Sequence, residues 1–287
     1  MKKLKELQTR EDLALYLAIP LQKLTYILYK SKPDSYYDTF EIPKKNGESR
    51  QIHAPSGDLK QLQKKLEQRL WDVYREFIEE NEIQDNISHA FQKGKSIITN
   101  ANIHRNKRYV LNLDLKDFFD HFHFGRVRGF FMKNKNFELP VEIATMIAQL
   151  TCYEGKLPQG APTSPIITNL VCNILDMRLL KIAKKYRVVY TRYADDMTFS
   201  TNDKKFLENQ ENFMKSIKKE IESFGFEIND KKTRLLFCDS RQEVTGLVVN
   251  KKISVNREYC KRTRAMADAF YRRGIFEIGG EEGSVNQ

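Results

Sequence analysis

Residues 188–200 read Val-Val-Tyr-Thr-Arg-Tyr-Ala-Asp-Asp-Met-Thr-Phe-Ser, and the fold can be worked out from this stretch. Two short apolar runs flank the pair Asp195-Asp196, which predicts two strands joined by an acidic tip. An acidic residue at the end of an apolar strand is unusual, because burying an unpaired carboxylate costs several kcal/mol. The pair therefore indicates either a polar hairpin turn or a site that uses the charge.

A third carboxylate ends another apolar strand. Residues 108–115 read Arg-Tyr-Val-Leu-Asn-Leu-Asp-Leu, so Asp114 closes a run that predicts a buried strand. If the strands that end at Asp114 and flank Asp195-Asp196 pair in one β-sheet, these acidic residues are expected to be neighbours. Neighbouring carboxylates can hold two divalent ions roughly 3.5 to 4 Å apart, an arrangement that makes or breaks phosphodiester bonds. Taken singly, each acidic residue would equally fit a turn or a strand-end cap.

The order of elements around these strands predicts an α+β fold. Between residue 108 and about 250 the pattern is β-α-β-β-α-β, a split arrangement typical of a ferredoxin-like sheet. Before it, we expect a hairpin around Asn46-Gly47 and a long helix from Leu59. After it, the pattern predicts a hairpin around Asn250-Lys251 and a basic helix over Arg257–Arg273.

Composition limits the class of protein. The 287 residues are 40% hydrophobic with a net charge of +11, which fits a globular chain with a polyanionic partner, although basic solubility alone could also produce the surplus. No segment approaches the ~20 apolar residues of a membrane span, so we expect a cytoplasmic protein without a membrane partner. The four cysteines lie far apart and suggest neither a zinc site nor a disulfide framework.

Four segments in order resemble one enzyme family. Tyr193-Ala194-Asp195-Asp196 resembles the Y-x-D-D signature of reverse transcriptases. Leu113–Asp120 resembles the strand with that family's first metal ligand, and Leu157–Pro165 resembles its loop at the nucleotide and template. Residues 224–233 resemble the segment after its palm helix. Two shorter elements, N-A-x-x-H at 100–104 and V-T-G at 244–246, resemble bacterial retron reverse transcriptases.

This resemblance covers most of the chain and implies a right-hand polymerase. Helical and hairpin fingers would span residues 1–107. A ferredoxin-like antiparallel palm would span 108–250, with finger insertions that include the 157–165 loop. Residues 251–287 would form the start of a helical thumb, which would be incomplete.

The resemblance also implies RNA-directed DNA polymerase activity with two Mg²⁺ ions, for which Mn²⁺ could substitute. Asp114 and Asp195 would ligate both ions, and Asp196 would assist. A primer hydroxyl would then attack the α-phosphate of a deoxynucleoside triphosphate. The residues expected at the nucleotide are Lys44, Arg50, Phe119, Gln159, Gly160 and Lys232.

Two of these assignments have alternatives. Phe119 lies five residues after Asp114, where the family has an aromatic gate against the ribose 2′-hydroxyl, but its neighbour Phe118 could be the ring that faces the site. Lys44 and Lys45 could simply protect the edge of the hairpin.

The retron elements imply binding to a cognate structured non-coding RNA and its DNA product. The expected RNA-binding residues are Asn100, His104, Val244, Thr245, Gly246, Arg257, Lys261 and Arg264. The last three are three or four residues apart and share a helix face. His104 could equally be a packing residue, and the basic helix could serve only solubility.

By the same resemblance, the product would be branched RNA-linked DNA (msDNA), made in antiviral defence together with an effector protein. Two other functions fit the sequence. One is another bacterial reverse transcriptase, of the intron-encoded or diversity-generating type. The other is an RNA-binding scaffold that restrains an effector without polymerising. All three aspartates are present, which favours an active enzyme.

Overall fold

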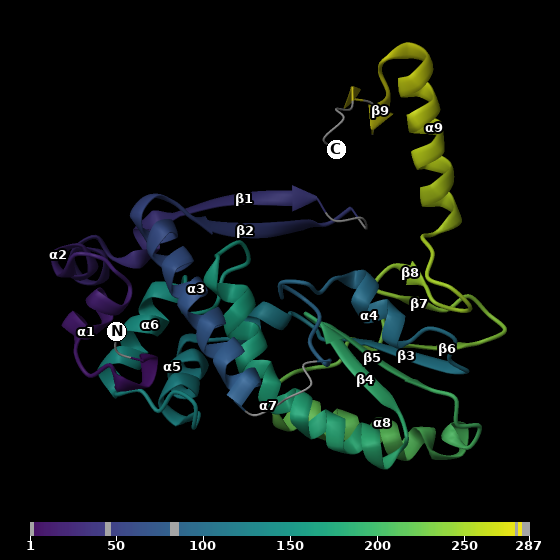
Figure 1. Ribbon diagram of the computed structural model, residues 1–287, viewed down its shortest axis with the longest axis horizontal. Coiled ribbons are helices and arrows are strands. Elements are labelled where there is room, and N and C mark those ends of the chain that lie inside the picture. The colour runs from purple at the N-terminus through teal and green to yellow at the C-terminus, as the bar shows by residue number, and fades with distance from the viewer. Residues whose placement is uncertain (1–2, 44–46, 81–85, 279–280, 283–287) are drawn as a thin grey trace.

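The computed structural model describes residues 3–43, 47–80, 86–278 and 281–282 (Figure 1). The first part of the chain forms short helical turns at Leu4–Glu6, Tyr26–Ser31 and Pro33–Tyr36, with α1 (Arg10–Tyr16), α2 (Leu21–Thr25), β1 (Tyr37–Pro43), β2 (Ser49–Pro55), α3 (Gly57–Glu80) and α4 (Ile97–Ile103). The central part forms β3 (Tyr109–Asp114), a 3-10 turn at Phe118–His121, α5 (Phe124–Lys133), α6 (Val141–Thr151), α7 (Thr163–Lys185), β4 (Val189–Tyr193), β5 (Asp196–Thr201), α8 (Phe206–Ser223) and β6 (Arg234–Phe237). The last part forms β7 (Glu243–Val244), β8 (Leu247–Val248), α9 (Arg257–Arg273), β9 (Glu277–Ile278) and β10 (Glu281–Glu282).

A four-stranded antiparallel sheet lies at the centre, with strand order β4-β5-β3-β6. Numbered within the sheet, this is the 2-3-1-4 order of a ferredoxin-like fold, as the element order predicted. α7 and α8 cover one face, where Phe199 of β5 contacts Phe213 of α8. α4 covers the other face, where His104 at its end bonds β4 and β5. The helices therefore leave the strand ends free for a site.

The hairpin β1–β2 confirms the turn expected near Gly47. Its register runs from Tyr37 opposite Pro55 to Pro43 opposite Ser49, and Gly47 has φ of +85°. The long helix that follows is α3, whose buried side chains Leu59, Leu62, Leu66 and Leu70 recur at helical spacing. The hairpin thereby stands on a helix that is fixed in the core.

The hairpin expected around Asn250-Lys251 is present as one antiparallel pair, because Val248 and Ser254 on either side of that turn exchange two backbone hydrogen bonds, of 2.8 and 3.1 Å. A second hairpin that was not expected precedes it, in which the paired strands β7 and β8 enclose a two-residue turn at Thr245-Gly246. Thr245 and Gly246 have φ of +47° and +81°, the two positive angles that a tight hairpin turn uses. The V-T-G element is thus the tip of a short hairpin.

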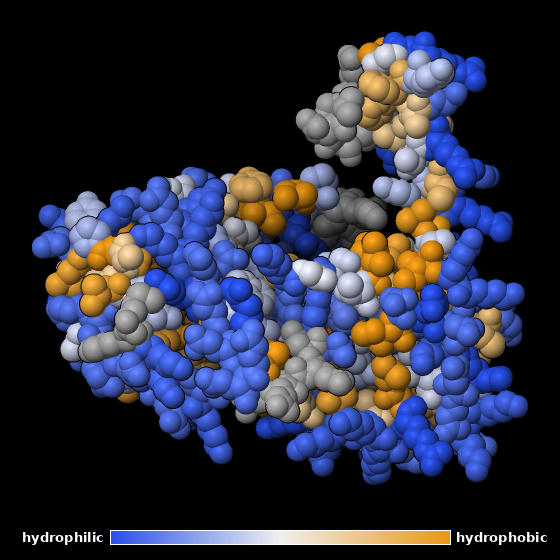
Figure 2. Space-filling view, viewed as in Figure 1, coloured by the Kyte–Doolittle hydropathy of each residue, from blue (hydrophilic) through white to orange (hydrophobic). Residues whose placement is uncertain are grey.

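The basic helix α9 begins and ends at the expected residues. The side chain of Asn256 caps its N-terminus, and Gly274, with φ of +73°, ends it. None of its residues is buried, and it projects from the body of the molecule (Figure 1). Figure 2 shows hydrophilic residues over most of this face of the molecule, with apolar ones at the β1–β2 hairpin and below α9.

Among the described residues, no helix is both long and apolar enough to cross a bilayer. All four cysteines, Cys152, Cys172, Cys238 and Cys260, are free thiols.

Candidate active site

The sheet register brings the three acidic residues together at one end of the palm. Asp114 at the end of β3 is paired with Asp196 at the start of β5. Tyr193 of β4 is paired with the same Asp196, so Ala194 and Asp195 form a two-residue turn between β4 and β5. The backbone of Leu115 donates to the carbonyl of Asp195 at 3.1 Å and ties that turn to β3. The neighbours expected from the order of elements are therefore neighbours in the fold.

The segment after α8 holds Asp114 in place. The backbone of Asn229 donates to the carbonyl of Asp114 at 2.8 Å, and its side-chain amide donates to Oδ2 at 3.3 Å. Lys232 Nζ contacts both carboxylate oxygens, at 2.9 and 3.1 Å. Because the Lys232 side chain is 61% exposed, this ion pair contributes little stability, and its main effect is on the charge of the site.

The electrostatics of the turn indicate an acidic cluster that lacks full compensation. Desolvation, followed by repulsion from Asp195 and Asp114, raises the pKa of Asp196 to about 7. Desolvation and the charge of Asp114 also raise the pKa of Asp195, against the opposing charges of Lys232 and Arg50. A hydrogen bond to Asp114 raises the pKa of Lys232. A cation placed among these carboxylates would relieve the repulsion between them.

The donor chemistry fits hard divalent ions, which take carboxylate oxygens as ligands. Within the described residues no three acidic, histidine or cysteine side chains already converge as a metal-binding group. Lys232 instead neutralises Asp114. A divalent ion at this cluster would either share the Asp114 carboxylate with Lys232 or displace it.

A cleft of about 480 Å³ adjoins the site. Asp114, Asp196 and Lys232 line one part of it, and Thr245 and Gly246 of the V-T-G turn line another. The remaining lining residues come from β3, β5, β6 and the segment before the turn: Asn112, Leu113, Thr198, Arg234, Leu236, Arg241 and Glu243. The V-T-G turn is thus placed beside the acidic cluster.

The loop at 157–165 packs against the β1–β2 hairpin. The carbonyl of Gln159 accepts from the backbone of His53 at 2.8 Å. Gly160 has φ of +114°, and a Cβ there would lie 2.6 Å from Ile52 Cγ2, so the close approach requires glycine. Arg50 lies exposed near the start of β2, and its positive charge acts to lower the pKa of Asp195. Lys44 and Lys45 lie outside the described residues.

The two candidate gate residues have different environments. Phe118 is 4% exposed and packs against Phe122 and Phe226. Phe119 is half-buried and contacts Phe118 edge-on. Phe119 is therefore the more accessible of the two rings.

The N-A-x-x-H element lies inside the fold. Asn100 and His104 are both 0% exposed. The His104 ring bonds Ser200 Oγ and Thr191 Oγ1, each at 2.7 Å, and Thr191 Oγ1 also bonds Asn100. Burial lowers the pKa of His104 to about 3. In this conformation neither side chain has a surface with which to contact RNA, and the alternative of a packing histidine describes His104.

The two retron-like elements pack against each other. Ala101 of α4 and Val244 of β7 share a small apolar core with Val110, Leu247 and Val249. Thr245 Oγ1 donates to the carbonyl of Ile97 at 3.4 Å. Val244 is therefore buried, whereas Thr245 is partly exposed and Gly246 is exposed. On α9, Arg257, Lys261 and Arg264 are all exposed.

Sequence reasoning missed the residues that support the turn. Arg192 of β4 is 0% exposed and forms an ion pair with Asp176 of α7 at 2.8 Å. An arginine inside an apolar strand next to Tyr-Ala-Asp-Asp was an available signal, because a buried guanidinium needs an acidic partner. Asn229, which holds Asp114, gave no such signal.

Comparison with known proteins gives the family. Residues 42–258 match the family described as reverse transcriptase (RNA-dependent DNA polymerase). The retron Mx65 reverse transcriptase of Myxococcus xanthus is 34% identical over 276 residues, which cover 90% of this chain and 62% of that protein. The retron Ec86 reverse transcriptase of Escherichia coli is 34% identical over 257 residues, which cover 88% of this chain and 75% of that protein.

Among solved structures, telomerase from Candida albicans, in complex with a TWJ fragment of telomeric RNA, matches with a TM-score of 0.55 at 13% identity. The match covers 77% of this chain and 46% of that one, and it supports the fold alone. The ferredoxin-like sheet agrees with the family match over residues 42–258. It also agrees with the 34% identity to the two retron reverse transcriptases. The chain belongs to the reverse transcriptase family, and within it to the retron reverse transcriptases.

Proposed function

We propose that this chain is an RNA-directed DNA polymerase that copies part of a cognate structured RNA into DNA from deoxynucleoside triphosphates. The observation that carries the proposal is the pairing of Asp114 with Asp196 beside the Asp195 turn. We assign residues 1–107 to the fingers, 108–250 to the palm and 251–287 to the start of the thumb. All four strands of the central sheet, β3 to β6, lie within the proposed palm.

Asp114 and Asp195 would hold two divalent ions, with Asp196 assisting, and Mg²⁺ is the proposed species with Mn²⁺ as a substitute. When bound, such ions make a primer hydroxyl more acidic and neutralise charge on the phosphates. The chain itself orients the reactants. Arg50 would bind the triphosphate, Phe119 would lie beneath the sugar, and the Gln159-Gly160 backbone would pack beside the nucleotide.

Lys232 would act at the same site. It neutralises Asp114 in this conformation and stands at the rim of the cleft. With a divalent ion at Asp114, the ammonium group of Lys232 would be available to the anionic phosphates.

The proposed RNA partner would contact the cleft edge at Thr245 and Gly246 and the exposed face of α9 with Arg257, Lys261 and Arg264. Asn100, His104 and Val244 would support this surface from inside. The net charge of +11 supports a polyanionic partner. The branched msDNA product, the effector protein and the role in defence stay predictions from the resemblance.

The deciding experiment is primer extension on an RNA template with Mg²⁺ or Mn²⁺. Asp195→Asn combined with Asp196→Asn should abolish synthesis while RNA binding persists, because the metal ligands are lost and the basic surface is kept. Asp239→Asn is the matched control. Asp239 follows β6, whose last residue, Phe237, pairs with Tyr109 at the opposite end of β3 from Asp114. Metal-dependent synthesis by the double variant would remove these residues from the mechanism.

A second experiment separates the polymerase from a scaffold. The protein is purified with its bound nucleic acid, which is then treated with RNase and with DNase. An RNA-linked DNA supports the polymerase. RNA alone, together with no primer extension by the wild type, would favour the scaffold.

A further inference from the structure

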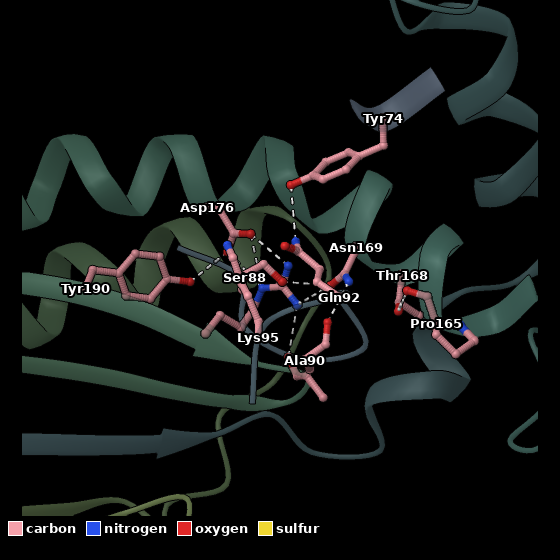
Figure 3. A network of polar contacts seen from close by, with 12 residues as sticks. Tyr74, Ser88, Ala90, Gln92, Lys95, Pro165, Thr168, Asn169, Asp176 and Tyr190 are labelled. Atoms are coloured by element: carbon pink, nitrogen blue, oxygen red, sulfur yellow. Dashed lines mark hydrogen bonds and ion pairs between the residues drawn. The ribbon is translucent and has the colours of Figure 1, made fainter. Parts of the chain in front are cut away.

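A buried ion pair lies directly behind the proposed catalytic turn. Arg192 on β4 and Asp176 on α7 are 0% and 2% exposed. The guanidinium contacts the carboxylate through two nitrogens, with Nε 2.9 Å from Oδ1 and Nη2 2.8 Å from Oδ2. Figure 3 shows Tyr190 beside Asp176, with the Tyr190 hydroxyl donating to Oδ1 at 2.8 Å. The pair therefore fixes one strand of the turn to the long helix α7.

The third nitrogen of the same guanidinium reaches the turn itself. Arg192 Nη1 donates to the carbonyl of Ala194 at 3.2 Å. Ala194 has φ of +56°, a conformation that costs energy for a residue with a Cβ and persists only where its surroundings impose it. Asp195 is the next residue. The carbonyl bond to Arg192 on one side and the Leu115 bond to the Asp195 carbonyl on the other define the backbone that carries the acidic side chains.

Residues 87–90 fix Arg192 from the open edge of the sheet. The backbone of Arg192 donates to Ile87 at 2.8 Å, and its carbonyl accepts from His89 at 2.9 Å. The side chain of Asn169 on α7 also bonds this segment, residues 87–90 (Figure 3). Its oxygen accepts from Ser88 Oγ at 2.9 Å, and its nitrogen donates to the carbonyl of Ala90 at 3.0 Å. The backbone of Arg192 is thereby bonded to residues 87 and 89, and its side chain is bonded to Asp176 of α7.

We propose that Arg192, anchored by Asp176, is a positioning residue that sets the backbone of the Ala194-Asp195 turn and so aims the acidic side chains. This inference rests on the proposed polymerase function. A general stabilising role explains the arrangement poorly, since apolar residues of similar volume often replace buried ion pairs without loss of stability. What apolar residues cannot supply is the N–H group aimed at the Ala194 carbonyl.

The test replaces the whole ion-paired group with apolar residues. In the triple variant Tyr190→Phe/Asp176→Leu/Arg192→Met, no buried charge is left unpaired, so the melting temperature should stay near that of the wild type. The contact with the Ala194 carbonyl is nevertheless lost. We expect kcat for primer extension to fall about 10²-fold, the size of effect that a misplacement of about 1 Å produces. KM for the nucleotide and the affinity for RNA should stay at wild-type values.

Tyr190→Phe alone is the matched control. It removes a hydrogen bond to the same carboxylate without touching the turn, so kcat should be unchanged. Arg192→Lys is a second variant, in case the triple variant fails to fold. A lysine can pair with Asp176 but lacks the planar fork that also reaches the carbonyl, so kcat should fall at unchanged KM.

The outcomes separate this inference from the proposed function. A wild type without polymerase activity would overturn the proposed function itself. An active wild type together with a folded triple variant of wild-type kcat would overturn only the positioning role. A parallel loss of kcat and RNA affinity would also overturn it, because that pattern indicates a general structural defect. If only Arg192→Lys folds, a wild-type kcat in that variant would overturn it.

Discussion

At the scale of single residues, His104 shows how a buried group ties stability to pH. Its ring is fully buried between β4, β5 and α4, and burial, followed by the charges of Lys107 and His89, lowers its pKa to about 3. The folded protein therefore keeps His104 neutral, whereas the unfolded chain binds a proton below a pH of about 6.5. The unfolded state binds more protons in that window. The contribution of His104 to the free energy of unfolding is therefore fully present above pH 6.5 and is lost progressively as the pH falls toward 3.

We expect His104 to cost about 1.4 kcal/mol of unfolding free energy for each pH unit below 6.5. The measurement is urea unfolding of the wild type and of His104→Gln at pH 7, 6 and 5. The variant should be less stable at pH 7 and should lose less stability on acidification. Parallel pH profiles would contradict the assignment.

The two adjacent phenylalanines give a second prediction. Phe119→Val should raise the ratio of kcat/KM for ribonucleotides to that for deoxynucleotides, because a smaller side chain beneath the sugar leaves room for the 2′-hydroxyl. Phe118→Ala should instead lower stability by about 3 to 5 kcal/mol, the usual cost of deleting a buried ring. If Phe118→Ala shifts the ratio and Phe119→Val does not, the gate is the other ring.

The three aspartates could be predicted to be neighbours because each segment contained its own signal. Asp114 and Asp195-Asp196 stand out because each interrupts an apolar strand. The partners of Arg192 and His104 lie on other elements, Asp176 on α7 and Ser200 on β5. Local sequence does not determine which helix covers which strand. These two hydrogen-bond networks could therefore be identified only from the folded structure.

At the scale of elements, the loop at 157–165 and the β1–β2 hairpin form one unit. Gly160→Ala should displace the hairpin, because the added Cβ would lie 2.6 Å from Ile52 Cγ2 in a backbone conformation with φ of +114°. We expect KM for the nucleotide to rise as Arg50 and Gln159 move. We also expect a loss of about 1 to 3 kcal/mol in stability, the usual cost of overpacking.

Gly155→Ala is the matched control for that prediction. Gly155 also has a positive φ, +79°, but nothing lies within 4 Å of an added Cβ. It should therefore show the conformational cost without the rise in KM. Equal KM values in the two variants would show that the contact with Ile52 does not position the nucleotide-binding residues.

The order of strands was predictable because the β and α periods alternate clearly between residues 108 and 237. The turn of the β7–β8 hairpin was not, because a β-branched threonine at φ of +47° opposes local preference. Packing of Val244 and Leu247 against Ala101 and Val110 outweighs that preference.

At the scale of the whole molecule, charge is concentrated in the last described helix and the segment before it. Residues 251–273 contain eight Lys or Arg and two Glu or Asp, and α9 buries none of its side chains. A helix that contributes nothing to the core and carries this charge is suited to bind phosphates along a nucleic-acid backbone. The sequence predicted its bounds and its exposed face, since caps and helical spacing are local properties.

Neutralising Lys261 and Arg264 to Gln should weaken RNA binding and reduce its salt dependence. Each lost phosphate contact should lower the slope of log K against log salt by about 0.7 to 0.9. Lys215→Gln/Lys219→Gln on α8 is the control, since it removes the same net charge from two exposed lysines one helical turn apart. A local binding face predicts a change in slope only for the α9 pair, whereas general attraction to a basic protein predicts similar small changes for both. An unchanged slope in the α9 variant would leave the V-T-G side of the cleft as the RNA surface, because Asn100 and His104 are buried.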